Sequence, residues 1–482
     1  MPSQTKKITF DTLSLFVGRL IGLLFGIVRL KYLAIYLGLT NFGILNFATF
    51  FCSLFTVLFD FGISQLLTRE LSKNLKNSST YLGKIITLKL IVVFLASIMV
   101  GVAALLSRFS GLTNWAVLLT TIVFAVNGMS AVFLSAFQAH RKMVVVALSN
   151  IFNDLVLSVL IILLISSYPS VVTVLLFTIL VALLNFVVLA IVYILQVGVP
   201  KIKVDYPFWK GFSKESLIFA ISSLGISIYM YIGPTVLKYT RGDAEVGIFS
   251  SGYKLLSILT LIPMAFTQVL YPIFSDFYVN VKEKLTKSLS DSLRVMLIIS
   301  IPLVVGGIIL AKDIFKILFT LEFSSGIIVF QIMIIGIIVG YLNWILYTFV
   351  LAIGRQKFAM YSSLSIGFLV SLISILLIPR YGYIILPFIS IFTELMLFIP
   401  VTWYLNRNGY HVFSVSYFVK PVLSSLIMGM VIVILPDMHL FFSIMTGILS
   451  YTMIMYFSQG FGPQEKEILN IFLARVFTKK NT

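Results

Sequence analysis

Residues 170–196 read SVVTVLLFTILVALLNFVVLAIVYILQ, a run without a single charged side chain. A helix needs about 20 apolar residues to cross the hydrocarbon core of a bilayer. Comparable runs recur from Phe10 to Phe457 with short hinges between them. The composition agrees, since 60% of the residues are hydrophobic, 11% are charged and the mean hydropathy is +1.08, whereas soluble domains carry about 25% charged residues. Most of the chain is therefore predicted to lie in a membrane.

The predicted fold class is an all-α integral membrane protein with about 14 transmembrane helices. The predicted spans are 10–37, 42–67, 82–106, 114–139, 143–166, 170–196, 214–239, 247–275, 291–311, 326–352, 358–378, 383–405, 413–435 and 440–459.

The formal net charge of +18 is distributed unevenly over the loops between these spans. Twenty-four basic residues fall on one set of alternate loops together with both termini, whereas the other set holds seven: Lys31, Arg108, Lys238, Arg241, Lys312, Lys316 and Arg380. Cytoplasmic loops of membrane proteins are enriched in Lys and Arg. We therefore expect both termini in the cytoplasm. Topology and anionic lipid headgroups explain the positive charge, so no nucleic-acid partner is expected.

The loops contain no pattern for enzymatic chemistry. The chain has no G-x-x-x-x-G-K-[ST] phosphate loop, so it is not expected to hydrolyse ATP by itself. Its histidines, His140, His411 and His439, have no metal-ligand spacing. The tight carboxylate pair of Asp243 and Glu245 on an outward loop is interpreted as turn chemistry. We expect no enzyme, no cofactor and no metal site.

Two motifs recur at six-helix spacing. Gly38-x4-Gly43-Ile44 is repeated as Gly242-x4-Gly247-Ile248, and the stretch 138–143 after the fourth span resembles 353–358 after the tenth. Two six-helix lobes related by a pseudo-two-fold axis are therefore predicted, the plan of alternating-access transporters whose substrate lies between the halves. The expected domains are 1–200 and 201–410 for the lobes, 411–460 for two extra transmembrane helices and 461–482 for an amphipathic tail on the cytoplasmic surface.

Several stretches resemble the polysaccharide (O-antigen type) flippases of bacteria and archaea, which belong to the multidrug/oligosaccharidyl-lipid/polysaccharide exporter superfamily. The stretches that carry this resemblance are Gly18-Arg19-Leu20, Tyr36-Leu37-Gly38, Phe42-Gly43-Ile44-Leu45, Phe61-Gly62-Ile63-Ser64, Leu67-Thr68-Arg69-Glu70-Leu71, residues 242–249, Gly252-Tyr253-Lys254-Leu255, Tyr271-Pro272 and Gly354-Arg355-Gln356-Lys357.

This resemblance implies a function in a prokaryotic cell (inner) membrane. Its expected activity is to move an isoprenoid-diphosphate-linked oligosaccharide from the cytoplasmic to the outer leaflet without ATP hydrolysis. The implied partners are this lipid-linked oligosaccharide, membrane lipids, a polysaccharide polymerase and glycosyltransferases. It also suggests that the two last helices form a hydrophobic groove for the lipid tail, the alternative being a peripheral lipid-facing hairpin.

Two arginines within the first span are candidate cavity residues. At 100° per residue, Arg19 and Arg29 share an arc of about 100° with Gly18, Gly22 and Gly26. The glycines alone favour a helix packing face. An arginine inside a membrane costs about 2.5 kcal/mol or more unless it meets water or a partner. The pair is therefore expected either to line the substrate cavity, where guanidinium groups bind diphosphate well, or to form structural ion pairs.

The remaining intramembrane charges divide in the same way. Lys254 and Lys89 are candidate cavity residues, and Lys89 has an ion pair with Asp60 as its alternative. Asp154 and Glu394 are candidates for an ion-coupling site, for a polar cavity wall or for helix contacts.

Two alternative functions remain open at this point. A cation-coupled multidrug exporter of the same fold is one, although carboxylates are then expected to dominate the cavity. A membrane polysaccharide polymerase or glycosyltransferase is the other, and the short outward loops disfavour it.

Overall fold

The computed structural model describes residues 2–73, 75–410, 416–435 and 439–462, and for residues 2–17, 19, 20, 76 and 416 it describes the backbone alone. The described elements are helices. Seventeen are α-helices: α1 (Pro2–Leu54), α2 (Thr56–Asp60), α3 (Ile63–Lys73), α4 (Ser78–Leu106), α5 (Gly111–Ala139), α6 (Met143–Leu164), α7 (Val171–Gln196), α8 (Tyr206–Arg241), α9 (Asp243–Leu259), α10 (Leu261–Asn280), α11 (Lys282–Leu318), α12 (Gly326–Ile335), α13 (Ile337–Ala352), α14 (Gln356–Tyr381), α15 (Ile385–Arg407), α16 (Ser416–Ile434) and α17 (Leu440–Phe457).

The predicted membrane fold is confirmed. Within the described residues, eleven helices are long and apolar enough to cross a membrane, or twelve if the bent pair of α12 and α13 counts as one span. The sequence-based number is higher because two of these helical stretches, Ile21–Leu54 and Gln356–Arg407, each contain the boundary between two predicted spans. These boundaries lie at Gly38 and Gly382, whose φ angles of +69° and +63° favour glycine.

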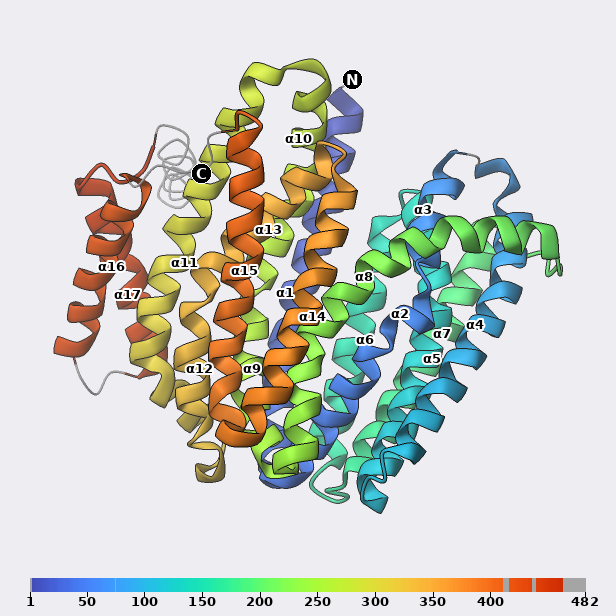
Figure 1. The fold of residues 1–482 in the computed structure, drawn as a ribbon, viewed down its shortest axis with the longest axis horizontal. Helices are drawn as coiled ribbons and strands as arrows, with labels where there is room; N and C mark the ends of the chain where they lie inside the picture. The colour runs from blue at the N-terminus through green and yellow to red at the C-terminus, as the bar shows by residue number, and fades with distance from the viewer. Residues whose placement is uncertain (1, 74, 411–415, 436–438, 463–482) are drawn as a thin grey trace, which may run out of the picture.

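The helices form two groups around α1 and α8. Figure 1 shows α2 to α7 on one side and α9 to α15 on the other, with α1 and α8 running between them. The helix α1 packs along α6 and α9, and α8 packs along α14. The expected domain boundaries at 200 and 410 fall in the linkers that follow α7 and α15.

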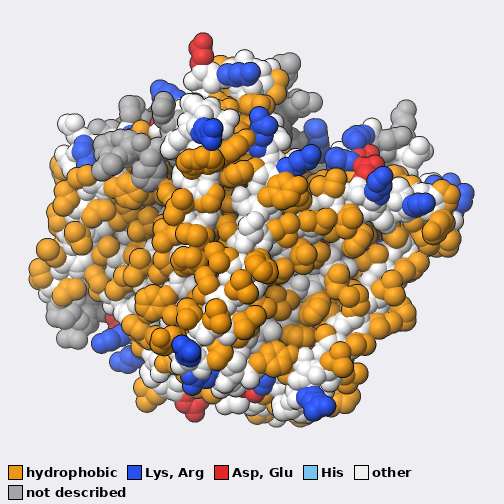
Figure 2. All heavy atoms as spheres, viewed as in Figure 1, with side chains coloured by type: hydrophobic (Ala, Val, Ile, Leu, Met, Phe, Trp, Pro, Cys, Tyr) orange, Lys and Arg blue, Asp and Glu red, His pale blue; other side chains and the backbone are white. Residues whose placement is uncertain are grey.

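The outer surface suits a bilayer. On the face shown in Figure 2, hydrophobic side chains form a broad band, and lysines and arginines gather at its two ends. The end that carries the N-terminus in Figure 1 includes the linkers before α4, α8 and α11. This distribution agrees with helices that run from one membrane surface to the other.

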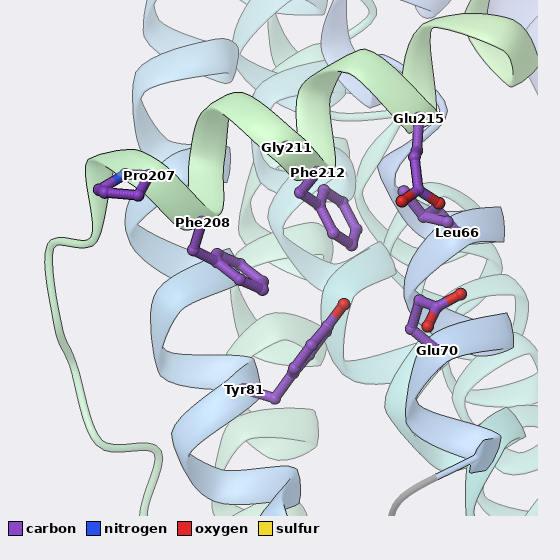
Figure 3. Close-up of a pocket in the computed structure, with 8 residues that line it drawn as sticks. All are labelled: Leu66, Glu70, Tyr81, Pro207, Phe208, Gly211, Phe212 and Glu215. Carbon is purple, nitrogen blue, oxygen red and sulfur yellow. The ribbon is translucent and has the colours of Figure 1, made fainter.

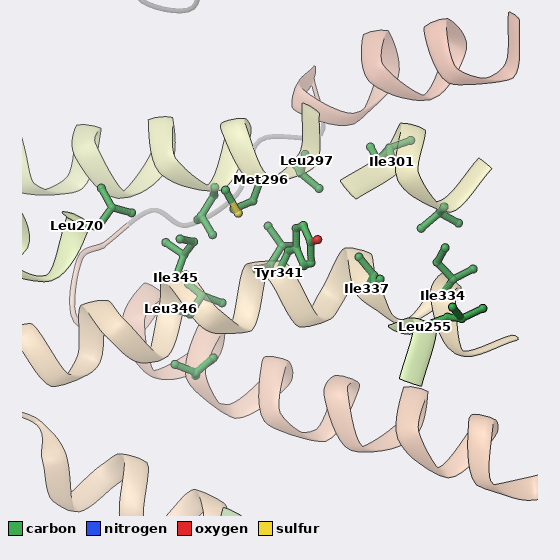
Figure 4. Packing of buried hydrophobic residues seen from close by; sticks show 14 of the residues in the cluster. Leu255, Leu270, Met296, Leu297, Ile301, Ile334, Ile337, Tyr341, Ile345 and Leu346 are labelled. Carbon is green, nitrogen blue, oxygen red and sulfur yellow. The ribbon is translucent and has the colours of Figure 1, made fainter. Parts of the chain in front are cut away.

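The largest apolar core lies in the second group of helices. Figure 4 shows Leu255 of α9, Met296 of α11 and Tyr341 of α13 within it, and all three are buried. The Tyr341 hydroxyl donates to the Leu259 carbonyl at 2.6 Å, where α9 ends and α10 begins. This hydrogen bond satisfies a polar group that would otherwise be buried without a partner.

The two last described helices, α16 and α17, lie at the edge of the molecule beside α11 (Figure 1). A Cβ atom on Gly429 would lie 3.0 Å from side-chain atoms of Ile309 and Val305, so α16 packs closely on α11. The buried hydroxyl of Tyr451 on α17 donates to the Ile298 carbonyl at 2.8 Å. The predicted amphipathic tail, 461–482, falls almost entirely outside the described residues.

Candidate functional site

The repeated glycine motifs meet each other in space. A Cβ atom on Gly43 would lie 1.9 Å from the Asp243 carbonyl oxygen, and one on Gly247 would lie 2.4 Å from the Leu39 carbonyl oxygen. The start of α9 therefore touches the α1 backbone just after Gly38. Lys238 and Asp243 form an ion pair beside this contact. The two halves of the chain are closed against each other here, at the end opposite the N-terminus (Figure 1).

The glycine face of α1 packs on α6. A Cβ atom on Gly18 would lie 3.4 Å from Ala147 and Ile151, and one on Gly22 would lie 2.6 Å from Oδ2 of Asp154. The face therefore serves as a packing surface, as its small residues indicate. Arg19 lies on α1, but its side chain is outside the described residues.

Arg29 forms an ion pair with Asp154 across this contact. Its Nη2 atom lies 3.3 Å from Oδ1 of Asp154, and the two side chains are 21% and 39% exposed. Its Nη1 atom also donates to Ser158 Oγ at 3.5 Å. Neither contact is short for a charge-assisted hydrogen bond. The guanidinium group is thus held loosely and remains partly accessible.

Lys254 on α9 lies close enough to Arg29 for the two positive charges to act on each other. Its side chain is partly buried, and it has no ion-pair partner among the residues that the structure describes. The structure thus brings together two of the predicted cavity residues, one from each half of the chain. Asp154 is the carboxylate paired with this cationic site.

Asp154 also lines a polar cavity of about 240 Å³ between α5, α6 and α7. The other polar residues on its wall are Asn127, Asn153 and Thr178. Of these, Asn153 stands next to Asp154 in the sequence, whereas Asn127 and Thr178 come from other spans and were not predicted. Their small polar side chains in otherwise apolar helices were the available signal.

Lys89 and Asp60 form a separate pair. Lys89 is fully buried, and its Nζ lies 2.9 Å from Oδ1 of Asp60 and 3.2 Å from the Asp60 carbonyl oxygen. Asp60 ends α2, and the next two residues, Phe61 and Gly62, have φ angles of 52° and 69°. A cation is favourable at the C-terminal end of a helix. This geometry makes Lys89 a cap on the broken helix between α2 and α3.

Glu394 belongs to a third group within the second half. Asn343 Nδ2 donates to Glu394 Oε2 at 2.7 Å and to the Glu394 carbonyl at 2.8 Å. The buried Oδ1 atom of Asn343 has no hydrogen-bond partner within the described part of the chain. The arrangement is polar and partly buried, as an ion site or a polar wall requires.

The fold is that of known membrane transporters. A structure described as lipid II flippase MurJ in an inward closed conformation matches with a TM-score of 0.73 and 16% identity, over 94% of this chain and 99% of that one. A multidrug resistance MATE family transporter of the MOP superfamily, in an inward-facing conformation, matches with a TM-score of 0.66 and 11% identity, over 80% and 95%. A MOP superfamily transporter from Pyrococcus furiosus, described as having a binding pocket of reverse polarity, matches at 0.59 and 12%, over 85% and 97%.

The fold is therefore one that multi-pass membrane transporters share. Residues 8–278, more than half of the chain, match the polysaccharide biosynthesis protein family. The chain belongs to this family. A comparison with curated protein sequences finds no match.

Proposed function

We propose that this protein moves an isoprenoid-diphosphate-linked oligosaccharide from the cytoplasmic to the outer leaflet of a prokaryotic cell membrane, for surface polysaccharide assembly of the O-antigen type. Its family supports a place in polysaccharide biosynthesis. The lipid II flippase that shares its fold supports a lipid-linked substrate. On this proposal both termini face the cytoplasm, and a polymerase and glycosyltransferases are the partners in assembly.

The observation that carries the proposal is that Arg29 and Lys254 stand on the packed helices α1 and α9, with Asp154 as the carboxylate bound to Arg29. Two like charges in a partly buried site repel each other, and each also loses hydration. Asp154 compensates for one of the two charges. An anion with two phosphate groups would compensate for the rest, because a guanidinium group binds phosphate oxygens bidentately and an ammonium group binds them as a point charge.

In this proposal Arg29 exchanges partners during transport. Its distance of 3.3 Å to Asp154 leaves the pair weak enough for a diphosphate to compete. When the substrate leaves, Asp154 takes the guanidinium back. Glu394 is the candidate for ion coupling in the other half, and α16 and α17 are the candidates for holding the lipid tail. Arg19 remains a candidate substrate ligand.

A cation-coupled multidrug exporter of the same fold is the alternative. This alternative is supported by the multidrug resistance MATE family transporter that shares the fold. The pair of Arg29 and Lys254 argues against it, because both residues repel a cationic drug. Asp154 is already held by Arg29 and would have to be released first.

A flipping assay with purified protein in liposomes tests the proposal. A fluorescent isoprenoid-diphosphate oligosaccharide is followed by the fraction that becomes accessible to a quencher. Arg29→Ala and Lys254→Met should each lose most of the flipping rate, and Arg29→Lys should recover part of it. The control variant Lys312→Ala removes an exposed positive charge elsewhere and should flip normally. Normal flipping by Arg29→Ala and Lys254→Met would contradict the proposed site.

A further inference from the structure

A second pocket, of about 250 Å³, lies away from the transport site. Figure 3 shows it between α3, α4 and the first turns of α8. It is lined by Leu66, Glu70, Tyr81, Pro207, Phe208, Gly211, Phe212 and Glu215. The transport function proposed above uses none of these residues.

Three aromatic rings form one wall of this pocket. The Tyr81 ring meets those of Phe208 and Phe212 edge to face, with centroids 5.0 and 6.2 Å away. Gly211 lies between the two phenylalanines, and a Cβ atom there would meet nothing within 4 Å. The helix α8 is thus open toward the pocket at this position. Aromatic faces attract cations.

Two carboxylates form the opposite wall, and each keeps a free oxygen. Arg69 binds Oε1 of Glu70 at 2.8 Å and Oε2 of Glu215 at 2.7 Å, and Lys73 binds Oε1 of Glu70 at 2.7 Å. No partner within the described residues binds Oε2 of Glu70 or Oε1 of Glu215. In Figure 3 the carboxyl groups of Glu70 and Glu215 point toward each other.

The Tyr81 hydroxyl completes this arrangement. Figure 3 shows it pointing upward between Phe212 and Glu70. Both glutamate charges act on it. The pocket therefore presents three oxygen acceptors beside an aromatic wall, and the charged residues that line it are both acidic. A primary ammonium group has three N–H donors and one positive charge.

We propose that this pocket binds the ammonium group of an aminophospholipid, such as phosphatidylethanolamine, at the membrane surface. Its level in the molecule supports a lipid source. The pocket lies at the first turn of α4, a predicted membrane span. The adjoining linker and the start of α8 expose the apolar side chains of Val199, Ile202, Val204 and Tyr206. Such residues suit the boundary between headgroups and acyl chains.

The phosphate of the same headgroup has partners close by. Lys210 and Lys214 are exposed on α8, on either side of Gly211 and Phe212 in the sequence. A zwitterionic headgroup can place its ammonium in the pocket and its phosphate against these lysines. Phosphatidylcholine keeps the positive charge but has no N–H donor, so it should bind more weakly.

Native mass spectrometry of the full chain, released from detergent with equal amounts of phosphatidylethanolamine and phosphatidylcholine, tests the proposal. The ethanolamine lipid should be retained about tenfold more, the ratio expected when charge-assisted hydrogen bonds worth about 1.4 kcal/mol are lost. Glu215→Gln and Glu70→Gln keep the shape of the pocket and should reduce this preference. Gly211→Trp should fill the pocket and abolish it.

Two matched controls should keep the preference. Glu283→Gln removes an exposed carboxylate at the start of α11, and Gly111→Trp adds the same side chain at another open position. Equal retention of both lipids by the unmodified protein would overturn the proposal, as would a preference that survives Gly211→Trp and Glu215→Gln. Binding of added spermidine that these two variants abolish, without retention of the ethanolamine lipid, would overturn the lipid assignment.

Discussion

The substitution Asp154→Asn distinguishes between an anionic and a cationic substrate, because it should change their binding in opposite directions. The amide keeps the shape of the carboxyl group and its place 3.3 Å from Arg29, but it removes the negative charge. Arg29 then has no competing carboxylate, and a diphosphate bound to Arg29 no longer meets a like charge. An anionic substrate should bind more tightly to this variant, whereas a cationic drug should bind more weakly.

The size of the effect follows from the position of Asp154. Two unit charges 4 Å apart interact by about 4 kcal/mol at an effective dielectric constant of 20, and by about 1 kcal/mol in water. Asp154 is 39% exposed, so the lower end of this range applies. A gain of about 1.4 kcal/mol corresponds to about tenfold tighter binding.

Fluorescence polarisation of a labelled isoprenoid diphosphate with purified protein in detergent measures this change. Asp276→Asn, which removes an exposed carboxylate from α10, serves as the control and should leave the dissociation constant unchanged. Flipping by Asp154→Asn should be slower despite the tighter binding, because Asp154 no longer reclaims Arg29. Tenfold weaker binding of the diphosphate would refute the reasoning, and so would an unchanged dissociation constant.

Three further predictions concern stability and orientation. Lys89→Met should lower the free energy of unfolding by about 3 kcal/mol, because it leaves Asp60 without its counter-ion at a helix break. Adding Asp60→Asn should recover most of the loss in a thermal unfolding assay, and no recovery would contradict the pair. Hydrogen bonds from Lys73 and Arg69 hold the pKa of Glu70 below its ordinary value. The stabilisation that these hydrogen bonds give should be complete above about pH 4.3 and be lost as the pH falls through the lowered folded-state pKa of Glu70. The difference in Tm between the unmodified protein and Glu70→Gln should therefore vanish in acid. A difference in Tm that stays constant with pH would argue against this. A cysteine at position 111 should react with an impermeant reagent from outside and one at position 284 should not, whereas equal labelling would overturn the orientation.

Much of the fold could be predicted because the length of an apolar run in the sequence indicates a helix that crosses the bilayer. The boundary between the first two spans was also visible, since the Gly38 motif recurs at Gly242. The reciprocal contact of the two motifs was not predicted, because it depends on how close α1 and α9 come in space. The break after Asp60 was likewise missed, because Phe61 adopts a left-handed conformation that its sequence does not favour.

The site was predicted less completely than the fold. Helical geometry placed Arg29 on the glycine face of its own helix. It could not predict the pairing with Asp154, because Asp154 lies 125 residues further along the chain, on another helix. The proximity of Lys254 to Arg29 has the same origin in the packing of α1 against α9. The ion pair of Lys89 and Asp60 was one of the two alternatives for Lys89, because the two residues stand at similar depths in neighbouring spans.

The most direct test of the central claim is the response of flipping to membrane potential. A diphosphate-linked substrate carries about two negative charges, and each contributes about 2.3 kcal/mol per 100 mV. In liposomes with a valinomycin-imposed potential and no sodium or proton gradient, an interior-negative potential should drive a fluorescent diphosphate-linked lipid outward, and the opposite potential should drive it inward. Flipping whose direction and extent do not respond to the sign of the potential would contradict the movement of an anion by this protein.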